Sequence, residues 1–142
     1  MRKTVFIFLC LLPFNLWAVD TKRFEFLASG YGNDFYLKIA LDESGLRTAE
    51  GFQYRDGDEK NRDFPVKLFD SQYVDWLFWQ VEQRCEFWSA PSVIGESGLD
   101  GYSFHIKGVK EAQQHTVSMW LPDNDCYHKL RQHLFIMTGS KW

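Results

Sequence analysis

The chain has 142 residues, of which 45% are hydrophobic and 18% aromatic, and its formal net charge is −3. This length suits one folded domain with a substantial core and is short for two. Nucleic-acid-binding domains usually carry a basic excess on one face. An acidic balance with no run of Lys and Arg longer than two argues against nucleic acid and against anionic lipid as partners.

The first residues follow the pattern of an export signal. Arg2 and Lys3 precede an apolar run over residues 5–12, Pro13 interrupts it, and Ala18 offers a small residue to a signal peptidase. The run is about half of the ~20 apolar residues that a membrane-spanning helix needs. We therefore predict cleavage after Ala18 rather than a permanent membrane anchor.

Removal of a signal peptide over residues 1–18 leaves one predicted domain over residues 19–142, in the periplasm or secreted, with no membrane span. Only Cys85 and Cys126 remain in this domain, and an even pair in an oxidising compartment is most simply a disulfide. Such a bond would close a loop of about forty residues, which contributes about 3 to 4 kcal/mol in the chain-entropy model. A reactive thiol and a buried free cysteine are the alternatives.

Three strands are predicted at the start of the domain, within residues 22–54. Apolar residues alternate along each segment, and turn-forming residues separate the segments. The residues expected on the core face are Phe24, Phe26, Phe35, Leu37, Ile39 and Leu41, and in the third strand Leu46, Thr48, Phe52 and Tyr54. The three strands together predict an antiparallel meander.

A helix is predicted after Asp70 or Ser71, either of which can cap its first turn. The residues at helical spacing that follow are Tyr73, Val74, Leu77, Phe78 and Val81. Trp76 and Trp79 widen this apolar arc. Either the helix is covered on two sides or its aromatic flank meets a partner, and burial is the simpler interpretation.

A hairpin and a second helix complete the predicted domain. The hairpin strands cover residues 102–107 and 115–120, and Asn124 or Asp125 can cap the last helix. The order predicts an α+β fold in which two helices pack on one face of an antiparallel sheet, built from the meander and the C-terminal hairpin. The predicted disulfide would join the end of the first helix to the start of the last.

The sequence contains no motif of a common catalytic or cofactor-binding class, such as a Gly-x-Ser-x-Gly elbow or a dinucleotide fingerprint. We therefore expect no enzyme, no catalytic residue and no cofactor. The four histidines lack i, i+4 spacing, and the acids between Asp56 and Asp63 lack the spacing of a calcium loop, so no metal site is expected.

The segment over residues 97–102 is the strongest candidate for a binding site. Gly98 and Gly101 free the backbone for a projecting loop, while Ser97, Asp100 and Tyr102 place hydroxyl and carboxylate groups beside it. These three polar residues are the predicted binding residues. An ordinary turn at the entry of the hairpin is the alternative, because Gly with Asp or Ser is the usual composition of turns.

Residues 71–138 resemble small exported bacterial domains that lack an assigned function. The shared pattern is Phe87-Trp88-x-x-Pro91, then Gly98-Leu99-Asp100-Gly101, then Trp120-x-Pro122. A second resemblance, to periplasmic lysozyme inhibitors, rests on Ser97, Gly98 and Tyr102. That likeness implies that Ser97 and Tyr102 would hydrogen-bond catalytic carboxylates of the inhibited enzyme.

The predicted function is that of an exported, non-catalytic domain that binds another protein of the envelope, such as a neutralising or immunity-like module. The aromatic excess supports it, because Trp and Tyr supply rigid contact area at interfaces. A lysozyme inhibitor, a small envelope enzyme and a ligand carrier are the alternatives. A polar pocket with two ionisable groups in hydrogen-bond reach would favour the enzyme, and a large apolar cavity would favour the carrier.

Overall fold

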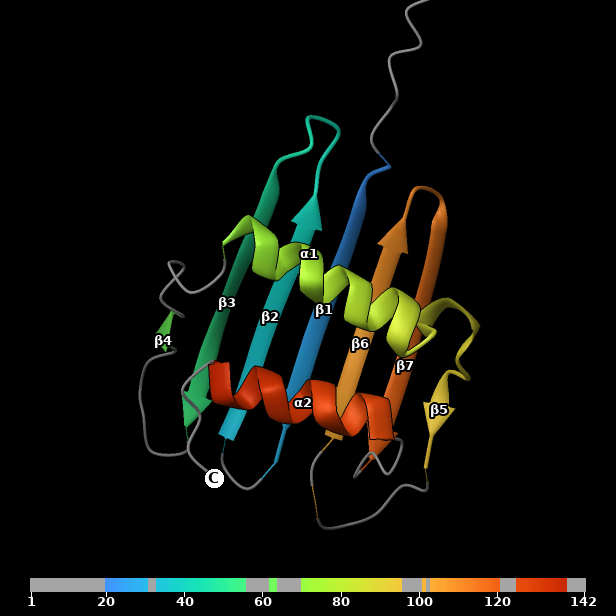
Figure 1. Cartoon of the computed structure of the whole chain (residues 1–142). Coiled ribbons are helices and arrows are strands. Elements are labelled where there is room, and N and C mark those ends of the chain that lie inside the picture. The colour runs from blue at the N-terminus through green and yellow to red at the C-terminus, as the bar shows by residue number, and fades with distance from the viewer. Residues whose placement is uncertain are drawn as a thin grey trace, which may run out of the picture.

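The structure, a computed structural model, describes residues 20–30, 33–55, 62–63, 70–95, 101, 103–120 and 125–137. In this part of the chain seven strands form one sheet in the order β4-β3-β2-β1-β6-β7-β5 (Figure 1). The strands are β1 Lys22–Ser29, β2 Asn33–Leu41, β3 Arg47–Arg55, β4 Arg62–Asp63, β5 Val93–Ile94, β6 Ser103–Lys110 and β7 Gln113–Trp120. The helices are α1 Ser71–Trp79 and α2 Asp125–Met137. The predicted signal peptide lies outside the described residues.

The described sheet is mostly antiparallel. Every neighbouring pair of strands runs antiparallel except β5 and β7, which are parallel over two residues. The prediction of an α+β fold with two helices is therefore confirmed. Neither helix, nor any other helix within the described ranges, is long and apolar enough to cross a membrane.

β1 lies at the centre of the sheet and has the bounds expected from its alternation. Phe24, Phe26 and Ala28 are fully buried, whereas Leu27 between them keeps 45% of its surface exposed. Successive side chains of a strand point to opposite faces. One face of β1 therefore belongs to the core and the other does not.

The predicted core face of β3 is wrong by one residue. Ala49 packs against the core, whereas Leu46 is 57% exposed, Thr48 is exposed and Phe52 stacks on Tyr36 of the opposite face. A shift of one residue moves every side chain of a strand to the other face. Only the backbone of Tyr54 is described.

Small residues explain the actual orientation of β3. Gly51 lies opposite Leu37 in the register, and Ala49 lies opposite Ile39. On this same face the Nε of Arg47 donates a hydrogen bond to the Asp75 carboxylate of α1 at 2.7 Å. The helix-side face of β3 therefore carries small residues and an Arg47 contact to α1. It has no run of large apolar side chains from which the core face could be predicted.

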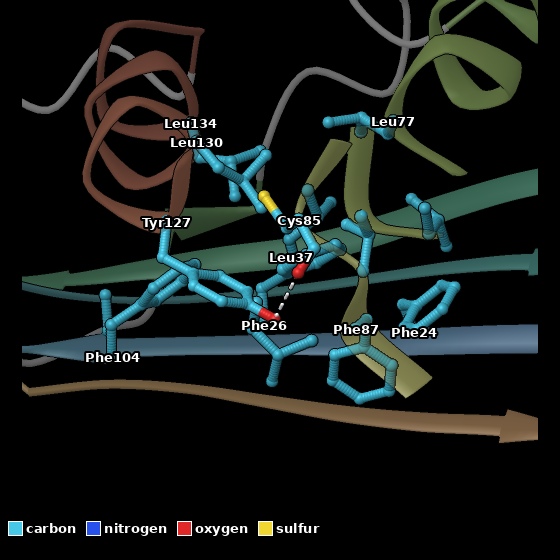
Figure 2. Packing of buried hydrophobic residues seen from close by; sticks show 14 of the residues in the cluster. Phe24, Phe26, Leu37, Leu77, Cys85, Phe87, Phe104, Tyr127, Leu130 and Leu134 are labelled. Atoms are coloured by element: carbon cyan, nitrogen blue, oxygen red, sulfur yellow. Dashed lines mark hydrogen bonds between the residues drawn. The ribbon is translucent and has the colours of Figure 1, made fainter. Parts of the chain in front are cut away.

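Both helices lie in front of the same face of the sheet and run across its strands (Figure 1). Asp70, one of the two residues predicted to cap α1, is its N-cap, and its side chain accepts a hydrogen bond from the Tyr73 amide. After Trp79 the helix continues as a π-helical stretch, Gln80–Arg84, and a 3-10 turn follows at Phe87–Ser89. The buried residues of the helices, together with those of the strands, form one aromatic-rich core (Figure 2).

The disulfide between Cys85 and Cys126 is present, and this prediction is confirmed. The two Cα atoms are 5.5 Å apart and the residues are 41 positions apart in the chain. Next to the disulfide, the Tyr127 hydroxyl donates a hydrogen bond to the Cys85 carbonyl at 3.1 Å (Figure 2). Burial, and secondarily the charge of Glu86, raise the pKa of Tyr127 to about 12, so the hydroxyl retains the proton that it donates.

Gly108 of β6 allows the 3-10 turn to approach the sheet closely. A Cβ atom at this position would overlap the ring of Phe87 and come within 2.6 Å of Cε1 of Phe24. The rings of Phe24 and Phe87 meet edge to face, with centroids 5.1 Å apart. A strand glycine is thus used here to pack two buried aromatic rings against the backbone.

Candidate functional site

The face of the sheet turned away from α1 and α2, here called the open face, presents side chains in rows that run across the strands. One row consists of Phe52, Tyr36, Leu27, His105 and Ser118, each directly opposite the next in the strand register. We call it the Phe52–Ser118 row. Its Tyr36 and Phe52 rings stack with centroids 5.4 Å apart, and Leu27 is exposed at its centre.

A second row on the open face alternates in charge. It consists of Glu50, Lys38, Glu25 and Lys107, again directly opposite one another across β3, β2, β1 and β6. We call it the Glu50–Lys107 row. Lys38 bonds to Glu50, which raises the pKa of the Lys38 ammonium, and Arg23 pairs with Glu25 at 3.1 Å. In the described part of the chain, Lys107 has no ion-pair partner.

The two rows influence each other electrostatically. Partial burial and, after it, the carboxylate of Glu25 raise the pKa of Tyr36, so its phenol stays protonated. Phe52, Tyr36 and Leu27 of the Phe52–Ser118 row are therefore uncharged at neutral pH. The open face thus presents a row with apolar and aromatic side chains beside a row of alternating charge.

A pocket of about 290 Å³ is located at the β5 end of the open face. Its described lining residues are Val93, Ile94, Gly95, Ser103, His105, Ser118, Met119 and Trp120. No charged side chain is among them. We call this the β5 pocket. Its volume is at the lower limit of ligand pockets, which are about 300 to 1,000 Å³, and so suits a group the size of one side chain.

Three short polar side chains converge on the β5 pocket. The Nδ1 of His105 and the hydroxyl of Ser118 are 3.0 Å apart and hydrogen-bonded, and the hydroxyls of Ser103 and Ser29 are 2.7 Å apart. The Nε2 of His105 has no partner among the described residues. The pocket thus combines apolar walls with hydrogen-bonding groups that carry no fixed charge.

The short strand β5 forms the outer wall of this pocket. It pairs in parallel with β7, so that Val93 lies opposite Ser118, and the Ser118 amide donates to the Ser92 carbonyl at 2.8 Å. The side chain of Val93 is 68% exposed. Val93 therefore adds exposed apolar surface to the rim of the pocket.

The predicted binding residues Ser97, Asp100 and Tyr102 lie outside the described residues. Gly95 and Ser103, the residues on either side of the 96–102 segment that contains them, both line the β5 pocket.

Two of the histidines that were considered as metal ligands make contacts with different parts of the fold. His115 bonds to the Ala90 carbonyl at 2.9 Å, and the ring of His133 lies against Tyr73 and Trp76 between the two helices. Among the residues that the structure describes, no three His, Cys, Asp or Glu side chains gather as a metal-binding group. These contacts place His115 and His133 in the packing of the fold.

The tryptophans of α1 have different environments. The Trp76 ring packs against Tyr73 and His133, with centroid separations of 5.6 and 4.6 Å. Trp79 keeps 49% of its surface exposed. Trp76 therefore belongs to the contact between the helices, while Trp79 offers exposed aromatic surface on the helical side.

A wider hollow of about 700 Å³ at the end of β1 and β2 has less to offer chemically. The basic side chains on its wall are already paired: Lys22 with Glu82, Arg23 with Glu25 and Lys38 with Glu50. We assign the candidate site to the smaller β5 pocket, whose described lining is mostly apolar and contains no Lys, Arg, Asp or Glu.

Sequence reasoning did not find the β5 pocket. Its polar residues come from β6 and β7, and its outer wall comes from a two-residue strand that no pattern predicted. The only signal in the sequence was the alternation that places Ser103, His105 and Lys107 opposite the apolar residues of their strand. That signal gives a face of a strand but not the neighbours across it.

Comparisons with known proteins add no relative. No family model matches the chain, and neither a curated protein nor a solved structure gives a significant match.

Proposed function

We propose that this chain is an exported, non-catalytic domain that binds another protein of the cell envelope, and that the β5 pocket receives an uncharged aliphatic or aromatic side chain of that protein. The observation that carries the proposal is the pocket itself: apolar walls, two hydroxyls and an imidazole, and no charged lining residue among those described.

Energetics favour an anchoring side chain as the occupant. Interfaces obtain most of their binding energy from a few residues that fill well-packed, desolvated pockets. Burying a charged group in this pocket would leave it without a counter-charge, whereas an apolar group gains from leaving water. The hydroxyls of Ser103 and Ser118 and the Nε2 of His105 can hydrogen-bond a polar tip such as that of Tyr or Trp.

Export is supported by two features from different parts of the chain. Residues 1–18 follow the signal-peptide pattern, and the Cys85–Cys126 bond is of the kind that persists in oxidising compartments. Ser97, Asp100 and Tyr102 are retained as proposed contacts with the partner, since their segment connects two residues of the pocket wall.

The experiment fills the pocket and asks whether the partner is lost. Ser118→Phe places a ring in the pocket, and Thr116→Phe places the same ring two residues away on the same face of β7, outside the lining. The wild type and both variants are immobilised, incubated with envelope extract, and compared by quantitative mass spectrometry. We expect a protein that is enriched on the wild type and on Thr116→Phe and is lost on Ser118→Phe.

The affinity of the identified protein then gives the size of the effect. Loss of an interface anchor costs about 2 kcal/mol or more, which is roughly a thirtyfold weaker Kd. If no protein is enriched on the wild type, or if Ser118→Phe retains it equally well with an unchanged thermal midpoint, the proposal is wrong.

A further inference from the structure

The Glu50–Lys107 row of the open face has four residues whose charges alternate in sign, and any such row is complementary in charge to a reversed copy of itself. Read from β3 to β6 its charges are negative, positive, negative, positive, and read in the opposite direction each sign is reversed. A second identical row, laid antiparallel on the first, would therefore place an opposite charge against every one of the four residues. Like charges would meet nowhere along it.

We infer that two copies of this chain pack with their open faces together, related by a two-fold axis parallel to the strands and located between β2 and β1. Such a contact is isologous, because the same patch serves both copies. Glu50 lies against Lys107 of the second copy, Lys38 lies against Glu25 of the second copy, and the symmetry repeats each pair. This inference goes beyond the proposed function and uses strands other than those that form most of the β5 pocket.

The neighbouring Phe52–Ser118 row fits the same axis. The two-fold rotation about the axis between β2 and β1 places Tyr36 against Leu27 of the second copy and Phe52 against His105 of the second copy. Leu27 is 45% exposed in the single chain, and a large aromatic ring is a favourable cover for it. Apolar contacts and charge pairs thus select the same pairing of strands.

The geometry of packed sheets is compatible with this pairing. Two sheets that pack face to face lie about 10 Å apart and keep their strands within about 30° of parallel. Side chains near the axis, such as Lys38 and Glu25, are then closest to their counterparts. Glu50 and Lys107 lie further from the axis, and their length allows them to reach across. In the single chain Lys107 has no ion-pair partner among the described residues, and this contact supplies one.

The β5 pocket remains outside most of this contact. The four strands that pair are β3, β2, β1 and β6, whereas Val93, Ser118 and Trp120 of the pocket belong to β5 and β7. His105 belongs to both contacts, but failure of the dimer and failure of the pocket are distinguishable, because the dimer is tested at Glu50 and Lys107 and the pocket at Ser118. The two proposals are tested by different variants.

Charge reversal tests the pairing directly. In Lys107→Glu and in Glu50→Lys, both symmetric contacts bring like charges together, and we expect the dimer dissociation constant from sedimentation velocity to rise by at least about tenfold. In the double variant, Glu50→Lys with Lys107→Glu, the opposite charges return and dimerisation recovers. Lys129→Glu, an exposed reversal on α2, is the matched control and leaves the constant unchanged.

Circular dichroism melting of each variant separates loss of the dimer from loss of the fold. Raising the salt concentration should weaken the wild-type dimer, because exposed charge pairs are screened. A wild type that stays monomeric at all concentrations overturns the inference. So does a dimer that neither single variant weakens, and so does a double variant that fails to recover while still folded.

Discussion

The two faces of the sheet use the same strands in different ways. On the face covered by α1 and α2, Phe26 of β1 is fully buried, whereas Leu27, the next residue, is 45% exposed on the open face. The covered face derives its stability from close aromatic packing that leaves little freedom to change. The open face contributes less to folding and so is free to present charge rows and a pocket. This contrast indicates where mutation should affect stability and where it should affect binding.

The sharpest test of this contrast compares two adjacent residues. Phe26→Ala should lower the free energy of unfolding by about 3 to 5 kcal/mol, because it removes a buried ring and leaves a cavity. Leu27→Ala should lower it by less than about 1 kcal/mol, as is usual for exposed positions. Urea denaturation of both oxidised proteins, at a concentration where the chain is monomeric, measures the difference. Equal losses would show that the open face is packed as tightly as the covered one.

Removal of the disulfide probes the covered side in another way. Cys85→Ala combined with Cys126→Ala should lower the free energy of unfolding by about 3 to 4 kcal/mol, because the unfolded chain gains the freedom of the opened loop. Chemical denaturation of the double variant and of the reduced wild type should agree. A loss below about 1 kcal/mol in both would mean that helix packing alone holds α2 on the sheet.

The smallest expected effect is a pH dependence that arises between the helices. Burial lowers the pKa of His133, whose ring lies against Tyr73 and Trp76. The unfolded chain then binds this proton at a higher pH than the folded protein, so stability is complete above about 6.5 and falls as the pH drops below that value. The lowered pKa of Asp42 acts only below about 3.8, in a separate range.

Thermal midpoints measured between about pH 7.5 and 5.5 check this expectation, since that range spans the ordinary histidine pKa. His133→Phe should weaken the pH dependence of the midpoint over this range, and the comparison variant is His128→Gln on the same helix. An unchanged slope in His133→Phe would assign the pH dependence to other groups.

Local patterns predicted the elements where one signal dominates. β1 begins and ends where alternation predicts, Asp70 caps α1, and the two cysteines of the predicted mature domain are bonded at the ends of helical segments. In each case the residues that decide the structure are close together in the sequence, or only one pairing is possible. The information needed was therefore local.

β3 shows where local patterns fail. Its large apolar residue Phe52 and its small residues Ala49 and Gly51 lie on opposite faces, and the small ones face the helices. The side that a strand presents to the core is decided by the space that α1 leaves, which alternation within the strand does not contain. Gly108 is explained in the same way, because a side chain at this position would overlap the Phe87 ring, which belongs to another element.

The candidate site depends even more on long-range arrangement. The Glu50–Lys107 row joins residues from four strands, and its alternation of charge exists only once the register of those strands is known. The β5 pocket likewise needs the parallel pairing of β5 with β7. The sequence supplied the polar residues but not their order across the sheet.

The place of β1 in the sheet has a consequence for the order in which the molecule can assemble. Synthesis begins at the N-terminus, so β1 is made early, yet one of its two neighbours is β6, and Leu27 pairs with His105, 78 residues later. Pairing over such separations slows folding. Until β6 emerges, one edge of β1 has no strand to pair with and the rings of Phe24 and Phe26 lack their final cover. The growing chain therefore depends on being kept apart from other chains until its last third has been made.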